Sequence, residues 1–290
     1  MATRLAQEIL AAASRGSYAV GAFNVTSPLQ MAAVLEAAAD KRSPVLIQTS
    51  VTPSKFYGPK FWATLFRTLA ADAGVPAALH LDHCTDIGHC LACVDAGYTS
   101  VMIDASKQIF EENVRQTREV CEYAHAHGVA VEGELGTVSG VEDQVKVVDN
   151  EASLCDPPKA VEFVRLTGVD YFAPAIGTAH GVYAVKNPKI DFERLARVQS
   201  LVNGGSLVAP LVIHGGTSLP EETVRELVRL GGSKVNVSTE LKHALIDTEY
   251  DYMSAHRDEY DPGKIDAAVK AETKRRIFAW MTLLGSVNRA

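Results

Sequence analysis

The sequence lacks several features that would assign it to a specialised class of protein. Its longest apolar stretches are short and interrupted, so it predicts no transmembrane helix and no membrane partner. Lysine and arginine together number 28 against 35 acidic residues, and the net charge of −7 excludes a generally basic nucleic-acid binder, though not a local basic patch. No short repeat of the solenoid kind is present.

Cysteine is scarce, with five residues in a chain of 290. Apolar residues make up 47% of the chain, which is enough to bury a large core without disulfides. Residues 1–16 also lack the long apolar core and small-residue cleavage site of a signal peptide. We therefore expect free thiols and a cytoplasmic location, where thiols stay reduced.

What recurs along the chain is a unit of short apolar strand, turn and helix. Strands are predicted at 18–22, 45–50, 77–81, 100–103, 130–134, 170–173, 207–213 and 234–236. Helices are predicted at 29–40, 59–73, 109–127, 158–167, 192–202 and 220–230. Eight such units favour an α/β fold, the (β/α)8 TIM barrel, although periodicity alone does not exclude a doubly wound sheet.

Two segments complete this organisation. Residues 265–284 predict an extra C-terminal helix, and no Pro/Gly/Ser-rich linker divides the chain, so residues 1–290 are expected to form one barrel domain. Residues 136–157 are the longest segment predicted to be irregular. Loops of that length usually act as functional lids or are disordered.

Three histidines fall at the carboxyl ends of predicted strands, where barrels of this kind carry their active sites. They are His83, His180 and His214. Three neutral imidazoles with one open position form a common catalytic zinc site, and such a metal acts as a Lewis acid. The alternative for each histidine alone is a satisfied core or surface residue, but the set of three favours the metal site.

Acidic residues accompany these histidines. Asp82 precedes His83 directly, where a carboxylate can orient a ligand, act as a general acid–base or simply cap the strand end. Asp104 and Glu134 end the fourth and fifth predicted strands. They fit acids at the barrel mouth, partners of the histidines or an alternative metal position.

Glycine-rich turns follow the sixth and seventh predicted strands. One runs from Gly177 to Gly181, and the other comprises Gly215, Gly216 and Thr217. Bare N–H groups, hydroxyls and a helix N-terminus form a natural phosphate cradle, which Asn236, Ser238 and Thr239 would complete. The alternative is ordinary helix capping, since neither turn is a Walker or Rossmann motif.

Together these segments resemble the class II, zinc-dependent ketose-bisphosphate aldolases, which include the fructose-bisphosphate and tagatose-bisphosphate enzymes. The matching stretches follow the family's order over nearly the whole chain: GAFN at 21–24, HLDH at 80–83, SVMIDAS at 100–106, VEGELG at 131–136, AIGTAHG at 175–181, VIHGG at 212–216 and NVST at 236–239. Each stretch alone is weak, whereas the ordered set is highly specific.

The resemblance implies a role for each matching residue. His83, His180 and His214 would bind Zn²⁺, and Asp82 would exchange a proton with the C4 hydroxyl or the aldehyde oxygen. Glu142, in the 136–157 loop, would move the C3 proton of dihydroxyacetone phosphate. Asp104 and Glu134 match residues that hold a displaced or second divalent ion. The substrate-binding residues implied are Asn24, Ser50, Gly181, Gly215, Gly216, Thr217, Asn236, Val237, Ser238 and Thr239, and some family members also hold Na⁺ or K⁺ near this cradle.

The implied activity is reversible aldol cleavage of a ketose 1,6-bisphosphate, most simply fructose 1,6-bisphosphate, to dihydroxyacetone phosphate and an aldehyde phosphate. Tagatose 1,6-bisphosphate, which differs at C4 alone, and other phosphorylated ketoses remain alternatives, as does a non-catalytic barrel that binds a sugar phosphate. The resemblance also implies a homodimer or homotetramer paired through the last helices.

Two segments depart from the family pattern. Thr217 and Ser218 stand where Ser-Gly is common, and Thr217 keeps the hydroxyl while Ser218 replaces a flexible glycine. Residues 48–55 differ from the Gly/Ala-containing loop that helps to recognise the far end of the substrate. The sequence therefore predicts the zinc chemistry more firmly than the identity of the sugar.

Overall fold

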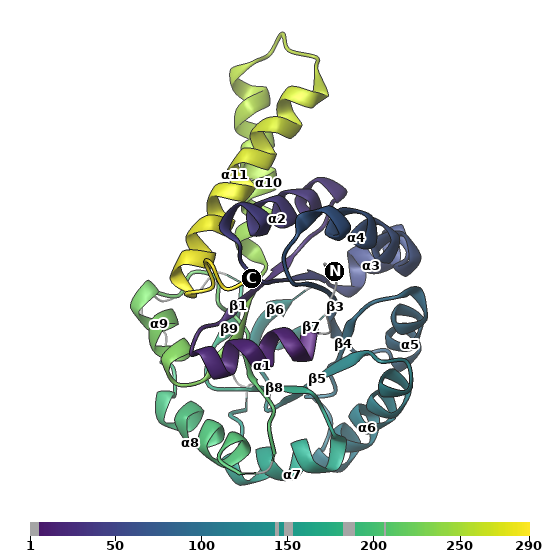
Figure 1. Ribbon diagram of the computed structural model, residues 1–290, viewed down its shortest axis with the longest axis vertical. Helices are drawn as coiled ribbons and strands as arrows, with labels where there is room; N and C mark the ends of the chain where they lie inside the picture. The colour runs from purple at the N-terminus through teal and green to yellow at the C-terminus, as the bar shows by residue number, and fades with distance from the viewer. Residues whose placement is uncertain (1–5, 143–144, 148–152, 182–188, 206) are drawn as a thin grey trace.

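Eight parallel strands close into a barrel in the computed structural model, which describes residues 6–142, 145–147, 153–181, 189–205 and 207–290 (Figure 1). Around the barrel the strands follow the order β1-β11-β10-β8-β5-β4-β3-β2. They are β1 (Val20–Asn24), β2 (Val45–Thr49), β3 (Ala77–Cys84), β4 (Ser100–Ile103), β5 (Ala130–Leu135), β8 (Tyr171–Pro174), β10 (Leu211–Ile213) and β11 (Gly232–Val237). The closed order confirms the predicted barrel and excludes the doubly wound sheet.

Helices lie around the barrel and across its amino-terminal end, and two of them project from it (Figure 1). They are α1 (Ala6–Gly16), α2 (Pro28–Lys41), α3 (Val51–Tyr57), α4 (Pro59–Ala73), α5 (Ile87–Ala96), α6 (Phe110–Ala126), α7 (Pro157–Thr167), α8 (Phe192–Asn203), α9 (Glu221–Arg229), α10 (Thr239–Ala255) and α11 (Pro262–Leu283). Side chains of Ser27, Asp86 and Asp191 cap α2, α5 and α8 at their N-termini. The sequence analysis gave no range for α1, α3, α5 or α10.

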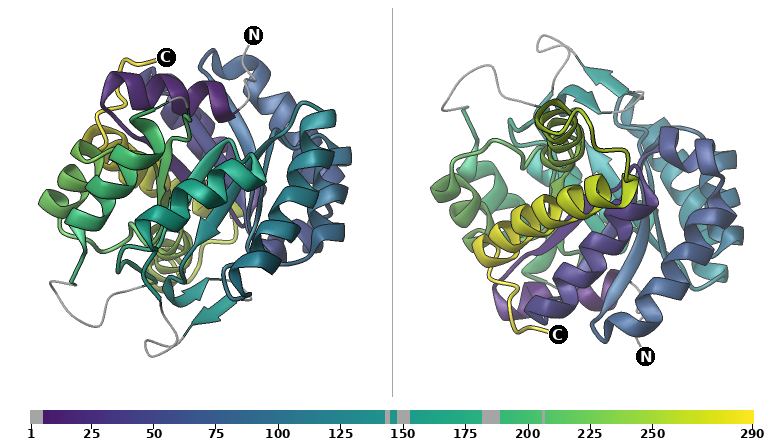
Figure 2. Two further views of the ribbon diagram at one scale, coloured as in Figure 1. Left: turned by 90° about the horizontal axis from the view of Figure 1, so that it is seen from below. Right: turned by 90° about the horizontal axis from the view of Figure 1, so that it is seen from above.

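Helix α1 closes the amino-terminal end of the barrel. Its residues Ile9, Leu10 and Ala13 are buried in one cluster with Val20 and Leu46 of the barrel strands. Figure 2 shows α1 at one end of the barrel and a small three-stranded sheet at the other. Because apolar side chains of α1 fill this end of the barrel interior, the carboxyl ends of the strands are the place to look for a site.

The small sheet lies in part of the segment that was predicted to be irregular. Strand β6 (Ser139–Glu142) pairs antiparallel with β7 (Val145–Val147) and parallel with β9 (Ala179–His180). The prediction of an irregular loop was wrong for these residues, because β9, distant in sequence, supplies the partner for β6. Glu142 ends β6, and its side chain lies outside the described part of the structure.

The last two helices, α10 and α11, form a hairpin that projects from the barrel (Figure 1). The expected extra C-terminal helix is α11, which begins at Pro262 because Asp261 caps it. Near its C-terminal end α11 buries Ile277 and Met281 in the main core. No helix in the described residues is long and apolar enough to cross a membrane.

Candidate active site

The three predicted histidines meet at the carboxyl end of the barrel. His83 lies in β3, His180 in β9, and His214 directly after β10. Their ring centroids are 4.7 Å (His83–His180), 4.5 Å (His83–His214) and 5.8 Å (His180–His214) apart. One ring nitrogen from each lies within 4.8 Å of the other two, and all three side chains are buried.

In each of the three rings, one nitrogen has no hydrogen-bond partner, as expected of a histidine that can bind a metal. His83 Nε2, His180 Nε2 and His214 Nδ1 are buried nitrogens with no hydrogen-bond partner. Unsatisfied buried polar atoms are costly and rare, so three that converge make this cluster a candidate site for a cation. On two rings the other nitrogen is occupied: His83 Nδ1 lies 2.9 Å from Asp104 Oδ2, and His214 Nε2 lies 2.7 Å from Glu132 Oε1. Such partners fix ring orientation in metal-binding histidines.

The two predicted carboxylates border this cluster. His83, Asp104 and Glu134 form a second group whose ligand atoms lie within 4.8 Å of one another. Glu134 Oε2 lies 2.9 Å from His214 Nδ1, but without hydrogen-bond geometry. Burial raises the pKa of Glu134, and the charge of Asp104 raises it further. Burial would also raise the pKa of Asp104, but the hydrogen bond to His83 and that ring's charge hold it below its usual range.

Asp82 is held between two amides. Asn24 Nδ2 donates to its Oδ2 at 2.7 Å, and Asn236 Nδ2 donates to its Oδ1 at 3.1 Å. Burial would raise the pKa of this carboxyl, but positive charge on His83 and Lys234 lowers it below its ordinary value. Asp82 is therefore an ionised carboxylate in a fixed orientation.

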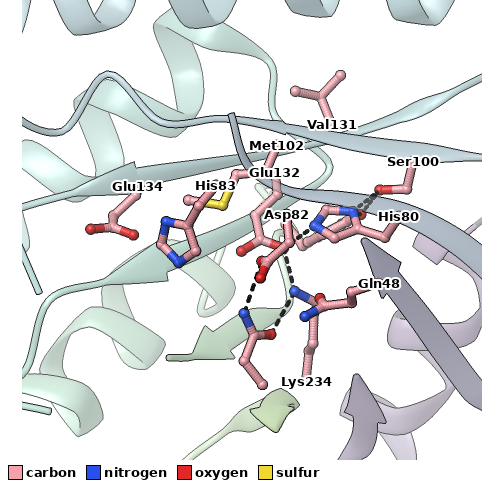
Figure 3. Close-up of polar contacts among 12 residues, drawn as sticks. Gln48, His80, Asp82, His83, Ser100, Met102, Val131, Glu132, Glu134 and Lys234 are labelled. Carbon is pink, nitrogen blue, oxygen red and sulfur yellow. Dashed lines mark hydrogen bonds and ion pairs between the residues drawn. The ribbon is translucent and has the colours of Figure 1, made fainter. Parts of the chain in front are cut away.

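A local irregularity lets Asp82 and His83 both face the site, although neighbours on a strand normally point to opposite faces. The register of β3 against β4 shifts between Leu81 and Cys84, which is the mark of a bulge. At the same place His83 has a left-handed backbone, with φ of 45°. This bend in β3 puts the carboxylate and the imidazole side by side (Figure 3).

The predicted phosphate cradle forms a small pocket beside Asp82. It is lined by Asn24, Asp82, His180, Gly181, Gly215, Gly216, Thr217, Asn236, Ser238 and Thr239. Glycine is required at 215, because φ is 68° and a Cβ atom would lie 2.3 Å from the Ala179 carbonyl oxygen. A larger cleft of about 330 Å³ lies at the opposite end of the barrel, near Tyr18 and Gly231, away from this chemistry.

Two predicted substrate-binding residues are not brought into the pocket. Ser50 is buried at the start of α3, and the Val237 side chain packs in the main core. In the turn that departs from the family pattern, Ser218 has φ of 66°. The serine thus adopts the left-handed conformation that glycine takes more easily.

The sequence analysis missed a layer of polar residues beneath the site. Gln48, His80, Glu132 and Lys234 are fully buried inside the barrel. Lys234 Nζ lies 2.8 Å from Glu132 Oε2, and His80 Nδ1 lies 2.7 Å from Ser100 Oγ. A signal was present: three of them lie two residues before Asp82, Glu134 and Asn236 on the same strands, and therefore on the same strand face.

His80 makes the stability of the fold sensitive to acid. Burial, and then the charge of Lys234, lower the pKa of His80 to about 3. Between pH 6.5 and 3 the unfolded chain therefore binds a proton at this residue that the folded chain does not, so stability falls as the pH falls.

From pH 6.5 to 4.5 the free energy of unfolding of the metal-free protein should drop by about 2 kcal/mol more than in His80→Gln. Denaturant titrations with equal pH slopes in both proteins would contradict this.

Comparison with known proteins agrees with this geometry. The profile of the family "Fructose-bisphosphate aldolase class-II" matches residues 4–289. A fructose-bisphosphate aldolase of Geobacillus stearothermophilus is 40% identical over 287 residues, covering 98% of this chain and 97% of the relative. One of Thermus caldophilus is 39% identical over 305 residues, covering 98% of each.

Solved structures give the same result. A putative fructose-1,6-bisphosphate aldolase from Coccidioides immitis superposes with a TM-score of 0.89 at 29% identity, covering 98% of this chain and 97% of that one. The YdjI aldolase from Escherichia coli K12 superposes with a TM-score of 0.83 at 27% identity, covering 99% of each. The chain belongs to the class II fructose-bisphosphate aldolase family, and is an enzyme of the lyase class.

Proposed function

We propose that this protein catalyses the reversible aldol cleavage of fructose 1,6-bisphosphate to dihydroxyacetone phosphate and an aldehyde phosphate. The observation that carries the proposal is the convergence, next to Asp82, of three histidine nitrogens that have no hydrogen-bond partner. A barrel that only binds a sugar phosphate has no use for a carboxylate clamped by two amides next to a metal site. The family membership and the names of the relatives support the same reaction.

His83, His180 and His214 would hold a Zn²⁺ ion, because three imidazoles with an open position suit catalytic zinc. When bound, zinc supplies a Lewis acid that stabilises negative charge developing on substrate oxygens. Asp104 and Glu134, with His83, would accept a displaced or second divalent ion. Main-chain carbonyls near the cradle would hold Na⁺ or K⁺, as in some members of the family.

The chain's own residues would position the substrate and move its protons. The main-chain N–H groups of Gly215 and Gly216, the Thr217 hydroxyl and the N-terminus of α10 would bind the phosphate of the dihydroxyacetone phosphate half. Asp82, ionised and fixed by its amides, would take the C4 hydroxyl proton as the C3–C4 bond breaks. Glu142 stays a prediction for the proton at C3.

The first measurement is a coupled assay of triose phosphate release from fructose 1,6-bisphosphate, with tagatose 1,6-bisphosphate in parallel and zinc quantified in each sample. We expect cleavage that chelation abolishes and Zn²⁺ restores, because three ligands and no closed fourth position make the metal removable. Preference for the tagatose sugar would correct the substrate. Turnover that persists after verified zinc removal would contradict the mechanism.

The same assay tests Asp82. Asp82→Ala should lower kcat at least about a hundredfold, the usual contribution of a positioned general acid–base, without lowering zinc content per chain. Asp86→Asn is the matched control, since this nearby carboxylate is 55% exposed and pairs with Lys55. If Asp82→Ala retained wild-type kcat with full zinc, the assignment of the acid–base would be wrong.

We also propose a single domain that works in the cytoplasm. Barrel strands run from Val20 to Val237 in one closed sheet, which supports one folding unit. All five cysteines are free and buried, and thiols of this kind suit a reducing compartment.

A homodimer or homotetramer is the proposed assembly, formed through the projecting part of the α10–α11 hairpin. Ile246, Tyr250 and Met253 on α10 are 59%, 70% and 50% exposed. Their spacing of four and three residues puts them on one face of the helix, and exposed apolar faces mark interaction surfaces.

Light scattering after gel filtration tests this assembly. Tyr250→Glu should shift the wild-type oligomer toward a smaller species, because it places a charge in an apolar interface. Asp251→Ala, an exposed residue on another side of α10, should leave the mass unchanged. A wild-type protein that elutes with the mass of one chain would refute the assembly.

A further inference from the structure

Lys234 is a buried cation beneath the candidate active site. Its side chain is fully removed from water, as is that of its partner Glu132. Removing two charges from water costs so much that apolar replacements of buried ion pairs are often neutral or stabilising. A gain in fold stability therefore explains poorly why this ion pair lies inside the barrel. The contacts that Lys234 and Glu132 make with the candidate site give a better explanation.

The first contact leads to Asp82. Lys234 Nζ lies 2.8 Å from Asn236 Oδ1. An ammonium group has only hydrogens to donate, so the amide atom that faces it must be oxygen. The amide nitrogen of Asn236 is then turned toward Asp82, to whose Oδ1 it donates at 3.1 Å. Without Lys234, a rotated Asn236 amide would set its oxygen against the carboxylate.

The second contact leads to the histidine cluster. Lys234 Nζ lies 2.8 Å from Glu132 Oε2, while Glu132 Oε1 lies 2.7 Å from His214 Nε2. Because an ionised carboxylate only accepts hydrogen bonds, the proton of His214 must reside on Nε2. In a neutral ring the lone pair is then on Nδ1, the nitrogen that faces the cluster and has no hydrogen-bond partner, although Glu134 Oε2 lies 2.9 Å away. Figure 3 shows Lys234, Glu132 and Asp82 converging in the barrel interior.

The other amide that clamps Asp82 provides an internal comparison. Gln48 Nε2 donates to Asn24 Oδ1 at 2.8 Å, and Asn24 Nδ2 donates to Asp82 Oδ2 at 2.7 Å. Gln48 thus orients Asn24 as Lys234 orients Asn236. Among the described residues, no hydrogen bond of Gln48 leads to a histidine of the cluster. Gln48 therefore differs from Lys234, which is also linked to His214 through Glu132.

We propose that Lys234 is a positioning residue that fixes two groups at once, the Asp82 carboxylate through Asn236 and the metal-facing nitrogen of His214 through Glu132. The role rests on the proposed function, since it concerns the acid–base and the metal ligand of that reaction. Lys234 itself would contact neither substrate nor metal.

The test compares Lys234→Met with Gln48→Met and Tyr171→Phe in the full-length protein. Each is measured for kcat and KM with fructose 1,6-bisphosphate, and for the Kd of Zn²⁺ alone by chelator competition on the metal-free protein. Tyr171 is the structural control, because it lies in the same buried layer but hydrogen-bonds to Ser100 and His80 rather than to Asn236 or Glu132.

Lys234→Met should lower kcat about a hundredfold with KM changed less than threefold, and should weaken zinc binding about tenfold, the lower end of the usual effect of losing a ligand's supporting partner. Gln48→Met should lower kcat while leaving the Kd of Zn²⁺ unchanged. Tyr171→Phe should leave both within threefold.

Lys234→Met leaves Glu132 buried without its cation, which destabilises the fold, so Lys234→Met/Glu132→Met supplies a neutral second variant with the same expected losses. A folded Lys234 variant with kcat or zinc affinity within threefold of the wild type would overturn the role, as would losses in that variant no larger than those of Tyr171→Phe. A wild-type protein that neither cleaves the sugar nor binds zinc would instead overturn the proposed function, and the role of Lys234 with it.

Discussion

Closure of the barrel is the constraint on which the candidate site depends. Strands β1 and β11 come from opposite ends of the chain and pair in parallel from Val20 with Lys234 to Phe23 with Val237. This pairing satisfies the last backbone groups of the sheet and leaves no open edge. It also brings Asn24 and Asn236 to the same side of the mouth, where both donate to Asp82. An open sheet of the same strands would separate these two amides.

The interior of the barrel divides along its axis into layers of different chemistry. At the amino-terminal end, α1 fills the barrel with apolar side chains such as Leu10. Above it lies the layer of buried polar groups that includes Glu132 and Lys234, and above that the histidine cluster. In a medium of low polarity, each charge in these layers requires a close partner, which is why so many of the contacts are fixed.

Two irregularities of the backbone adapt the barrel to chemistry. The bulge in β3 places Asp82 and His83 on the same side of a strand, which regular alternation forbids. The added strand β9 carries His180 and pairs with β6, so that the histidine is held by a small sheet outside the barrel rather than by a barrel strand. Both features bring residues of the candidate site together from positions that an ideal barrel would point away from the centre.

The sequence alone determined the strand–helix alternation and the histidine, aspartate and glycine positions at the strand ends, because periodic burial and turn residues are local properties of the chain. The choice of a closed barrel over a doubly wound sheet was decided by the pairing of β1 with β11. It also contained the pattern that places Lys234 on the face of Asn236, although the significance of that pattern is visible only when Glu132 lies opposite. The pairing of β6 with β9 could not be predicted from residues 136–157, since β9 lies at Ala179–His180, outside that segment. Only the tertiary structure decided which nitrogen of each histidine faces the cluster and which amide atom faces Asp82, because these orientations are set by neighbours that the closed barrel brings together.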